Sequence, residues 1–132
     1  MLIEFRVKNF RSLRDEQVLS LVASKDKTSQ DTHTFSTGLK AAPSLLRSAV
    51  IYGANASGKS NLIKALQYMR GVVVESATVI QPGQTYSVQP FRLDAESASK
   101  PVEFEITFIL GGVRYQYGFT MTQQRIVSEH LL

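Results

Sequence analysis

Residues 49–62 read AVIYGANASGKSNL, and this stretch decides the fold. Its central part, from Gly53 to Ser60, matches the pattern G-x-x-x-x-G-K-[ST] in full. The glycines of this pattern let backbone N–H groups of residues 55–60 turn inward as a nest for an anion, and the helix that follows adds the positive end of its dipole. The stretch therefore predicts a phosphate-binding loop between a strand and a helix.

Both flanks of the loop fit that prediction. Residues 49–52 form a short continuous apolar run, which is the pattern of a strand buried on both faces. After the loop, residues 60–75 carry apolar side chains at helical spacing, so we expect a helix with one apolar stripe. The stripe consists of Leu62, Ile63, Ala65, Leu66, Met69, Val72 and Val73.

The motif at residues 53–60 predicts which groups would bind a nucleotide. Lys59 would reach the β- and γ-phosphates, and the hydroxyl of Ser60 would be a Mg²⁺ ligand, because a hard cation prefers oxygen. ATP and Mg²⁺ are therefore the expected cofactors. The candidate nucleotide-binding residues here are Gly53, Asn55, Ala56, Ser57, Gly58, Lys59, Ser60 and Asn61.

Other motifs narrow the class of P-loop protein. The sequence contains neither a D-x-x-G nor an N-K-x-D element, which excludes a small GTPase. ATP hydrolysis of the Walker type needs an apolar strand that ends in an acidic residue, and the nearest match, residues 72–75, lies on the predicted helix. A nucleotide kinase would lack the same carboxylates and a recognisable lid. We therefore assign no catalytic residue and expect negligible ATPase activity from this chain alone.

Alternating residues predict strands at both ends of the chain. Residues 2–9 alternate apolar and charged side chains, with Ile3, Phe5 and Val7 on one face, and residues 17–22 form a second short candidate. A turn between these two segments would make an antiparallel pair.

A hairpin is predicted near the C-terminus. Residues 102–110 and 113–121 alternate on either side of a two-residue Gly-Gly turn, which pairs Leu110 with Val113 and places both apolar sets on one face. Residues 125–132 resemble the start of a third strand. We predict a mobile surface loop over residues 24–38 and a second loop, without assigned chemistry, over residues 77–89.

Composition sets further limits. The 132 residues include no cysteine, which excludes disulfides, thiolate catalysis and cysteine-bearing zinc sites. No signal peptide or membrane span is visible, so we expect a cytoplasmic chain without a membrane partner. The formal charge of +4 lies entirely in the first 60 residues. This surplus leaves an alternative open, a nucleic-acid-binding or protein-interaction module with a non-functional P-loop.

Two segments together resemble a known family. Residues 2–13, LIEFRVKNFRSL, followed by residues 52–62, YGANASGKSNL, look like the start of an ABC-type ATPase head of the SMC, RecF and OLD class. The chain is most similar to the AAA-type ATP-binding proteins of bacterial abortive-infection and other phage-defence systems. Residues 89–93, 104–110 and 115–119 also resemble the first lobe of such heads.

The resemblance implies an α/β fold, the first lobe of an ABC-type P-loop NTPase head. It would have a mixed sheet with an N-terminal antiparallel pair and a C-terminal β-hairpin. Residues 1–132 would then be the N-terminal part of one incomplete ATP-binding domain, because the Q-loop, signature motif, Walker B carboxylates and switch histidine of such heads have no match here. His130 lies in a predicted strand, so we do not give it the switch role.

The resemblance also implies ligands and partners. Arg11, and secondarily Ser12, would lie near the ATP phosphates, and Asn55 would contact the γ-phosphate side of the loop. Such heads dimerise around ATP, so the full-length form would be a homodimeric ATPase that drives a conformational switch in phage defence or DNA maintenance. An effector nuclease or toxin is a further expected partner, and DNA is a candidate one.

Overall fold

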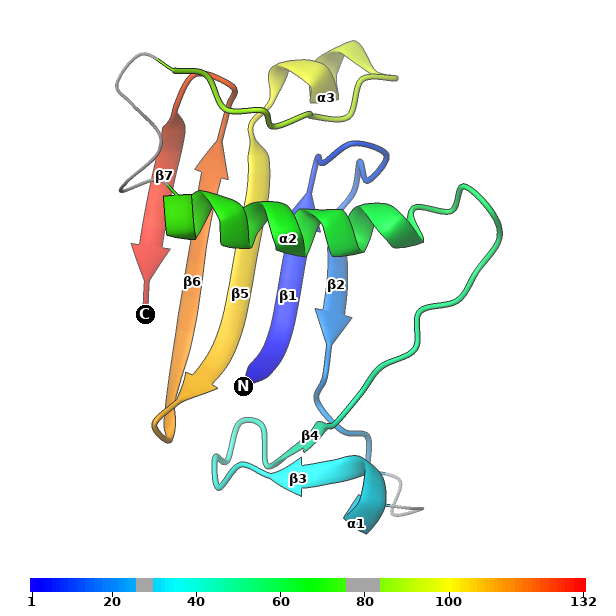
Figure 1. Cartoon of the computed structure of the whole chain (residues 1–132), viewed down its shortest axis with the longest axis vertical. Helices are drawn as coiled ribbons and strands as arrows, with labels where there is room; N and C mark the ends of the chain where they lie inside the picture. Colours follow the sequence, from blue (N-terminus) through cyan, green and yellow to red (C-terminus); the bar gives the residue numbers. More distant parts are fainter. Residues whose placement is uncertain (26–29, 76–83) are drawn as a thin grey trace.

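The computed structural model describes residues 1–25, 30–75 and 84–132. Its main feature is a five-stranded antiparallel sheet with the strand order β2-β1-β5-β6-β7 (Figure 1). The strands are β1 (Leu2–Lys8), β2 (Gln17–Ser20), β5 (Val102–Leu110), β6 (Val113–Met121) and β7 (Ile126–Leu131).

One long helix, α2 (Lys59–Glu75), crosses one face of this sheet (Figure 1). A separate two-stranded sheet lies beyond the end of β2. The remaining elements are α1 (Gln30–His33), β3 (Thr34–Ser36), β4 (Ser44–Leu46) and α3 (Ala95–Ser99).

The predicted strand pairs are confirmed. β5 and β6 pair from Val102 with Met121 to Leu110 with Val113, which is the predicted register. Gly111 and Gly112 both have positive φ, at 59° and 80°, and a tight turn between twisted strands requires this. β1 pairs antiparallel with β2, and β7 pairs antiparallel with β6 as the third strand.

Two predictions about the sheet are wrong. Every strand pairing in the described residues is antiparallel, so the sheet is not mixed. Residues 49–52 form no strand, and Val50 and Tyr52 are 84% and 90% exposed. A strand buried on both faces needs hydrogen-bonded neighbours and a layer on each side. Within the described residues the sheet strands pair with one another, and none pairs with residues 49–52.

The main core lies between α2 and the sheet. Ala65, Met69 and Val72 of the helix are buried, at the spacing of a single helix face. This face is narrower than the predicted stripe, since Ile63 and Val73 remain 44% and 46% exposed. The buried residues of this core are Phe5, Val7, Phe10, Leu13, Ala65, Met69, Val72, Val88, Val102, Phe104, Phe119 and Met121.

A β-bulge directs Ile3 away from that core. The register of β1 against β5 shifts between Leu2 and Glu4, so Ile3 does not share a face with Phe5 as strict alternation predicts. Ile3 packs instead in a second buried cluster with Ala42, Leu45 and Ile109. In β5, Phe104 is therefore buried in the main core, whereas Ile109 is buried in the second cluster.

The predicted loops differ in their outcome. Residues 30–36, expected to be mobile, form α1 and β3, and β3 pairs antiparallel with β4. That pairing places the partly buried Phe35 against the second cluster. Residues 26–29 of the first loop lie outside the described residues. In the second loop, residues 77–83 also lie outside them, and residues 84–89 have irregular backbone.

Tyr117 gives the fold a measurable pH dependence. Burial, and then its hydrogen bond to Oε1 of Glu129 at 2.7 Å, raise the pKa of Tyr117 to about 12. Because the pKa is higher in the folded state than in the unfolded state, the folded state prefers the neutral phenol over the tyrosinate. This stabilisation is fully present below the ordinary pKa of about 10 and is lost as the pH rises through about 12.

We predict that Tyr117→Phe removes this alkaline loss of stability. The free energy of unfolding, measured by urea denaturation between pH 9 and 12, should fall more steeply with pH in the wild-type chain than in the variant. The tyrosinate absorbance step with a midpoint near 12 should also disappear. Equal slopes for the two proteins would contradict the prediction.

Candidate nucleotide-binding site

The predicted loop leads directly into α2. Residues 53–58 have irregular backbone, and the N–H groups of Asn61 and Leu62 both donate to the carbonyl of Gly58, at 2.9 and 3.1 Å. The helix therefore begins at the end of the loop, within one residue of the predicted position. The positive end of the helix dipole lies at the same place, and the first helical turn contains no acidic residue.

The conformation of the loop explains its glycines. Gly58 has a φ of +95°, and a Cβ there would approach Cδ2 of Leu13 to 3.0 Å. A Cβ at Gly53 would lie 3.1 Å from Oγ of Ser57. Ala56 adopts a φ of +62°, which is uncommon for a residue with a side chain. The loop is therefore tightly curved, and a side chain at Gly53 or Gly58 would crowd neighbouring atoms.

Lys59 lies at the centre of this curve. Its Nζ donates to the carbonyl oxygens of Gly53 at 2.8 Å and Ala54 at 2.6 Å, and it lies 3.4 Å from Oγ of Ser57. Among the described residues no carboxylate forms an ion pair with Lys59. The loop therefore holds an ammonium group without a counter-charge beside a helix N-terminus. This arrangement fits an anionic ligand such as a phosphate chain.

The loop provides one candidate metal ligand. Ser60 is exposed in the first turn of α2, next to Lys59, so its hydroxyl can be reached by a cation that also binds phosphate. Within the described residues no group of three histidine, aspartate or glutamate side chains could hold a metal ion by itself. A Mg²⁺ ion held by the Ser60 hydroxyl would also take ligands from bound phosphates and water.

Arg11, in the turn after β1, lies beside the middle of α2 and not beside the predicted loop. Its φ is +54°, its N–H donates to the carbonyl of Gln89 at 2.8 Å, and its guanidinium group lies 5.5 Å from the ring centroid of Phe10. Together with Lys64 and Gln67 it lines a cavity of about 550 Å³ beside the middle of α2. Its role as a phosphate contact stays a prediction.

Ser12, the neighbour of Arg11, contacts the start of α2 directly. The side-chain amide of Asn61 donates to Oγ of Ser12 at 2.7 Å. The turn after β1 and the start of α2, which follows the predicted loop, are thus adjacent in the structure. The contact joins residues from the two sequence segments on which the resemblance rested.

Asn9 has a structural role that the sequence reasoning missed. It is 4% exposed, and its side-chain amide donates to the carbonyls of Ser97, Lys100 and Pro101 at 2.8 to 3.1 Å. Its Oδ1 accepts the N–H of Phe91 at 3.1 Å. The signal was present in the sequence: alternation stops at Asn9, and asparagine tolerates the positive φ of 59° found here.

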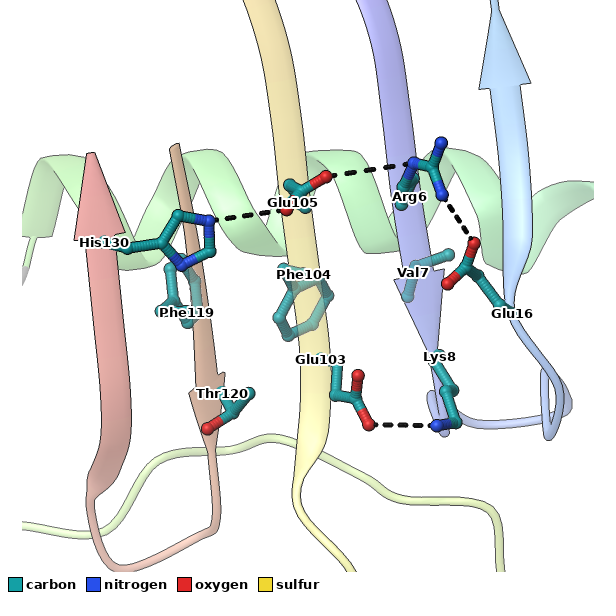
Figure 2. A pocket seen from close by; sticks show the side chains of 10 residues that line it. All are labelled: Arg6, Val7, Lys8, Glu16, Glu103, Phe104, Glu105, Phe119, Thr120 and His130. Carbon is teal, nitrogen blue, oxygen red and sulfur yellow. Dashed lines mark hydrogen bonds and ion pairs between the residues drawn. The ribbon is translucent and has the colours of Figure 1, made fainter. Parts of the chain in front are cut away.

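The outer face of the sheet, opposite α2, carries charges that are largely paired (Figure 2). Arg6 contacts Glu4 at 2.7 Å and Glu16 at 2.9 Å, and Lys8 contacts Glu103 at 3.2 Å. Arg6 and Lys8, two of the basic residues that contribute to the charge of +4, thus form ion pairs with carboxylates. The face offers little uncompensated positive charge to a nucleic acid.

His130 extends this paired face to the edge strand. Its Nε2 lies 3.3 Å from Oε2 of Glu105, two strands away, so the imidazole passes over β6 (Figure 2). Gly118 of β6 leaves the room for it, because a Cβ there would lie 2.7 Å from Cε1 of His130. The histidine belongs to this polar surface and lies outside the loop at residues 53–58.

The sequence motif, the helix that follows it and the sheet beneath define a class, the P-loop NTPase-like α/β domains. Residues 48–131 match a protein family described as "AAA domain, putative AbiEii toxin, Type IV TA system". The match covers more than half of the chain, and the chain belongs to this family, an ATPase-like AAA family related to abortive-infection systems. The matched residues include the loop, α2 and β5 to β7, and they exclude β1 and the turn after it.

A search of curated proteins found no match to this chain. In the part of the chain that the structure describes, no helix combines the length and the hydrophobicity that crossing a membrane requires.

Proposed function

We propose that residues 53–60 bind the phosphates of ATP together with Mg²⁺, and that the chain serves as the nucleotide-binding part of an ATPase. The observation that carries this proposal is the position of Lys59. Its ammonium group lies inside the loop, at the N-terminus of α2, with backbone carbonyls as partners in place of carboxylates. Membership of the AAA family supports the same ligand.

The contacts of Lys59 indicate how the loop would respond to a triphosphate. The carbonyls of Gly53 and Ala54 now accept from its ammonium group, and phosphate oxygens are stronger, charged acceptors. Lys59 would exchange these contacts for the β- and γ-phosphates. The N–H groups of residues 55–60 would then complete the anion nest, and the Ser60 hydroxyl would bind Mg²⁺.

The wider function is proposed from the family and from the resemblance. The full-length protein would be a homodimeric, ABC-type ATPase whose nucleotide state controls a conformational switch. A role in phage defence agrees with the abortive-infection family, and an effector nuclease or toxin would be the component that the switch controls. A role in DNA maintenance is the other candidate that the resemblance to SMC and RecF heads supports.

Lys59→Ala tests the proposal. We predict that it weakens binding of ATP·Mg²⁺ by about 10- to 100-fold, because a hydrogen bond to a charged group contributes roughly 1.5–3 kcal/mol. The measurement is a calorimetric or fluorescence titration on folded protein.

Arg70→Ala is the matched control for this experiment. Arg70 is an exposed basic residue of the same helix, about three turns beyond the loop, so its removal should change the affinity less than threefold. An equal loss in both variants would show that ATP responds only to the general positive charge, and it would overturn the assignment of Lys59.

A further inference from the structure

We propose that Ser12 and Asn61 are a positioning pair that holds the end of the phosphate-binding loop against the turn after β1. This inference rests on the proposed function and deepens it. Asn61 would then act through Ser12 and Gly58, without binding the nucleotide itself. Three features support this role: the direction of the Asn61 amide, the hydrogen bonds that close the turn, and the close fit of Gly58 against the turn.

The Asn61 side chain is already used by the protein. Its Nδ2 donates to Oγ of Ser12 at 2.7 Å, a short contact between residues 49 positions apart in the chain. Its backbone N–H donates to the carbonyl of Gly58 at 2.9 Å. Asn61 therefore connects the last residue of the loop before Lys59 with the turn after β1.

The turn that carries Ser12 is closed by backbone hydrogen bonds. Phe10 and Leu13 exchange two backbone hydrogen bonds, both 2.8 Å long, and their side chains are only 1% and 7% exposed. Arg11, between them, donates its N–H to the carbonyl of Gln89 at 2.8 Å. Ser12 thus lies at the tip of a closed turn with both ends in the core, so it can act as a fixed support.

The same turn also fits closely against Gly58. A Cβ at Gly58 would lie 3.0 Å from Cδ2 of Leu13 and 3.5 Å from Oγ of Ser12. The loop residue with a φ of +95° is therefore in contact with the turn, and the Ser12–Asn61 hydrogen bond lies beside it. Together these contacts fix the backbone at the point where the N–H groups of Gly58 and Lys59 would face a phosphate.

A double-mutant cycle tests the pair. We expect Ser12→Ala and Asn61→Ala each to weaken ATP·Mg²⁺ binding by about 3- to 10-fold, the range for one neutral hydrogen bond. The double variant should be no weaker than either single variant, because both changes remove the same contact. Ser12→Thr keeps the hydroxyl and should restore most of the affinity. Gln124→Ala, an exposed polar change in the turn between β6 and β7, is the control and should have no effect.

The outcomes are distinguishable. Additive losses, or a loss in Asn61→Ala with none in Ser12→Ala, would overturn the pair and indicate a direct ligand role for Asn61. Circular dichroism and the unfolding midpoint show that each variant is folded at the titration temperature.

If the wild-type chain does not bind ATP, the proposed function fails while the pair can still be judged. Amide hydrogen exchange of residues 58–62 without ligand would then be compared across the same four proteins. Faster exchange in both single variants, with no further increase in the double variant, would support the pair, and unchanged exchange would overturn it.

Discussion

Asn9→Ala is expected to lower the free energy of unfolding by about 3–5 kcal/mol. The asparagine amide is buried and satisfies three backbone carbonyls of the segment that includes α3, as well as the N–H of Phe91. Each buried polar group that loses its partner costs roughly 1–3 kcal/mol. A further cost of about 1 kcal/mol comes from the φ of +59°, which alanine tolerates poorly.

Two further substitutions separate the causes of that loss. Asn9→Gly removes the hydrogen bonds and accepts the positive φ, so it should be less destabilising than alanine by about 1 kcal/mol. Asn9→Asp keeps the size and the acceptor but directs a carboxylate oxygen at three carbonyls, so it should destabilise at least as much as alanine. The measurement is urea unfolding at neutral pH. A loss below 1 kcal/mol for Asn9→Ala would contradict this role.

Phe104→Ala is expected to cost a similar amount, about 3–5 kcal/mol, which is the range for removing a buried aromatic side chain. Phe104 is 2% exposed. Its ring centroid lies 5.6 Å from that of Phe10, 5.8 Å from Tyr68 and 5.4 Å from Phe119. The ring therefore joins the turn after β1, the helix and the sheet, and its removal would leave a cavity among all three.

Leu110→Ala is the matched control on the same strand. Leu110 is 66% exposed beside the hairpin turn, so its truncation should change the free energy of unfolding by less than about 0.5 kcal/mol. Chemical denaturation monitored by tyrosine fluorescence compares the two variants. Equal effects at the two positions would mean that the aromatic contacts around Phe104 do not organise the core.

The hairpin and the helix after the loop could be predicted because their signals are local. Strict alternation around Gly111 and Gly112 leaves one register that buries the apolar set, and the structure has that register. The helix follows from 3.6-residue spacing after a phosphate-binding pattern. In both cases the residues that decide the structure are neighbours in sequence.

The errors have non-local causes. Whether residues 49–52 form a buried strand depends on neighbouring strands, and the described residues provide none. The bulge at Ile3 depends on a second cluster formed with Leu45 and Ile109, which alternation within one segment cannot reveal. A polar composition over residues 24–38 hid the pairing of β3 with β4, which is anchored by Phe35 and Leu45.

The candidate site shows the same division. The spacing of residues 53–60 predicts the loop, its glycines and the lysine. The Ser12–Asn61 contact joins residues 49 positions apart, and the role of Asn9 depends on residues near position 100, so neither could be derived from periodicity. The sequence showed only that segments 9–12 and 58–61 occur together in one chain. In the structure these two segments are in contact.

The claim that residues 53–60 form the phosphate site is tested most directly by amide chemical-shift mapping of the ¹⁵N-labelled chain with ATP·Mg²⁺. We predict shifts concentrated at the amides of residues 55–61, where backbone N–H groups would meet phosphate oxygens, and the same shifts in Lys59→Ala should need about 10- to 100-fold more ATP·Mg²⁺. Shifts confined to the charged face around Arg6 and Lys8, or loop shifts that need no more ATP·Mg²⁺ in Lys59→Ala than in the wild-type chain, would contradict the claim.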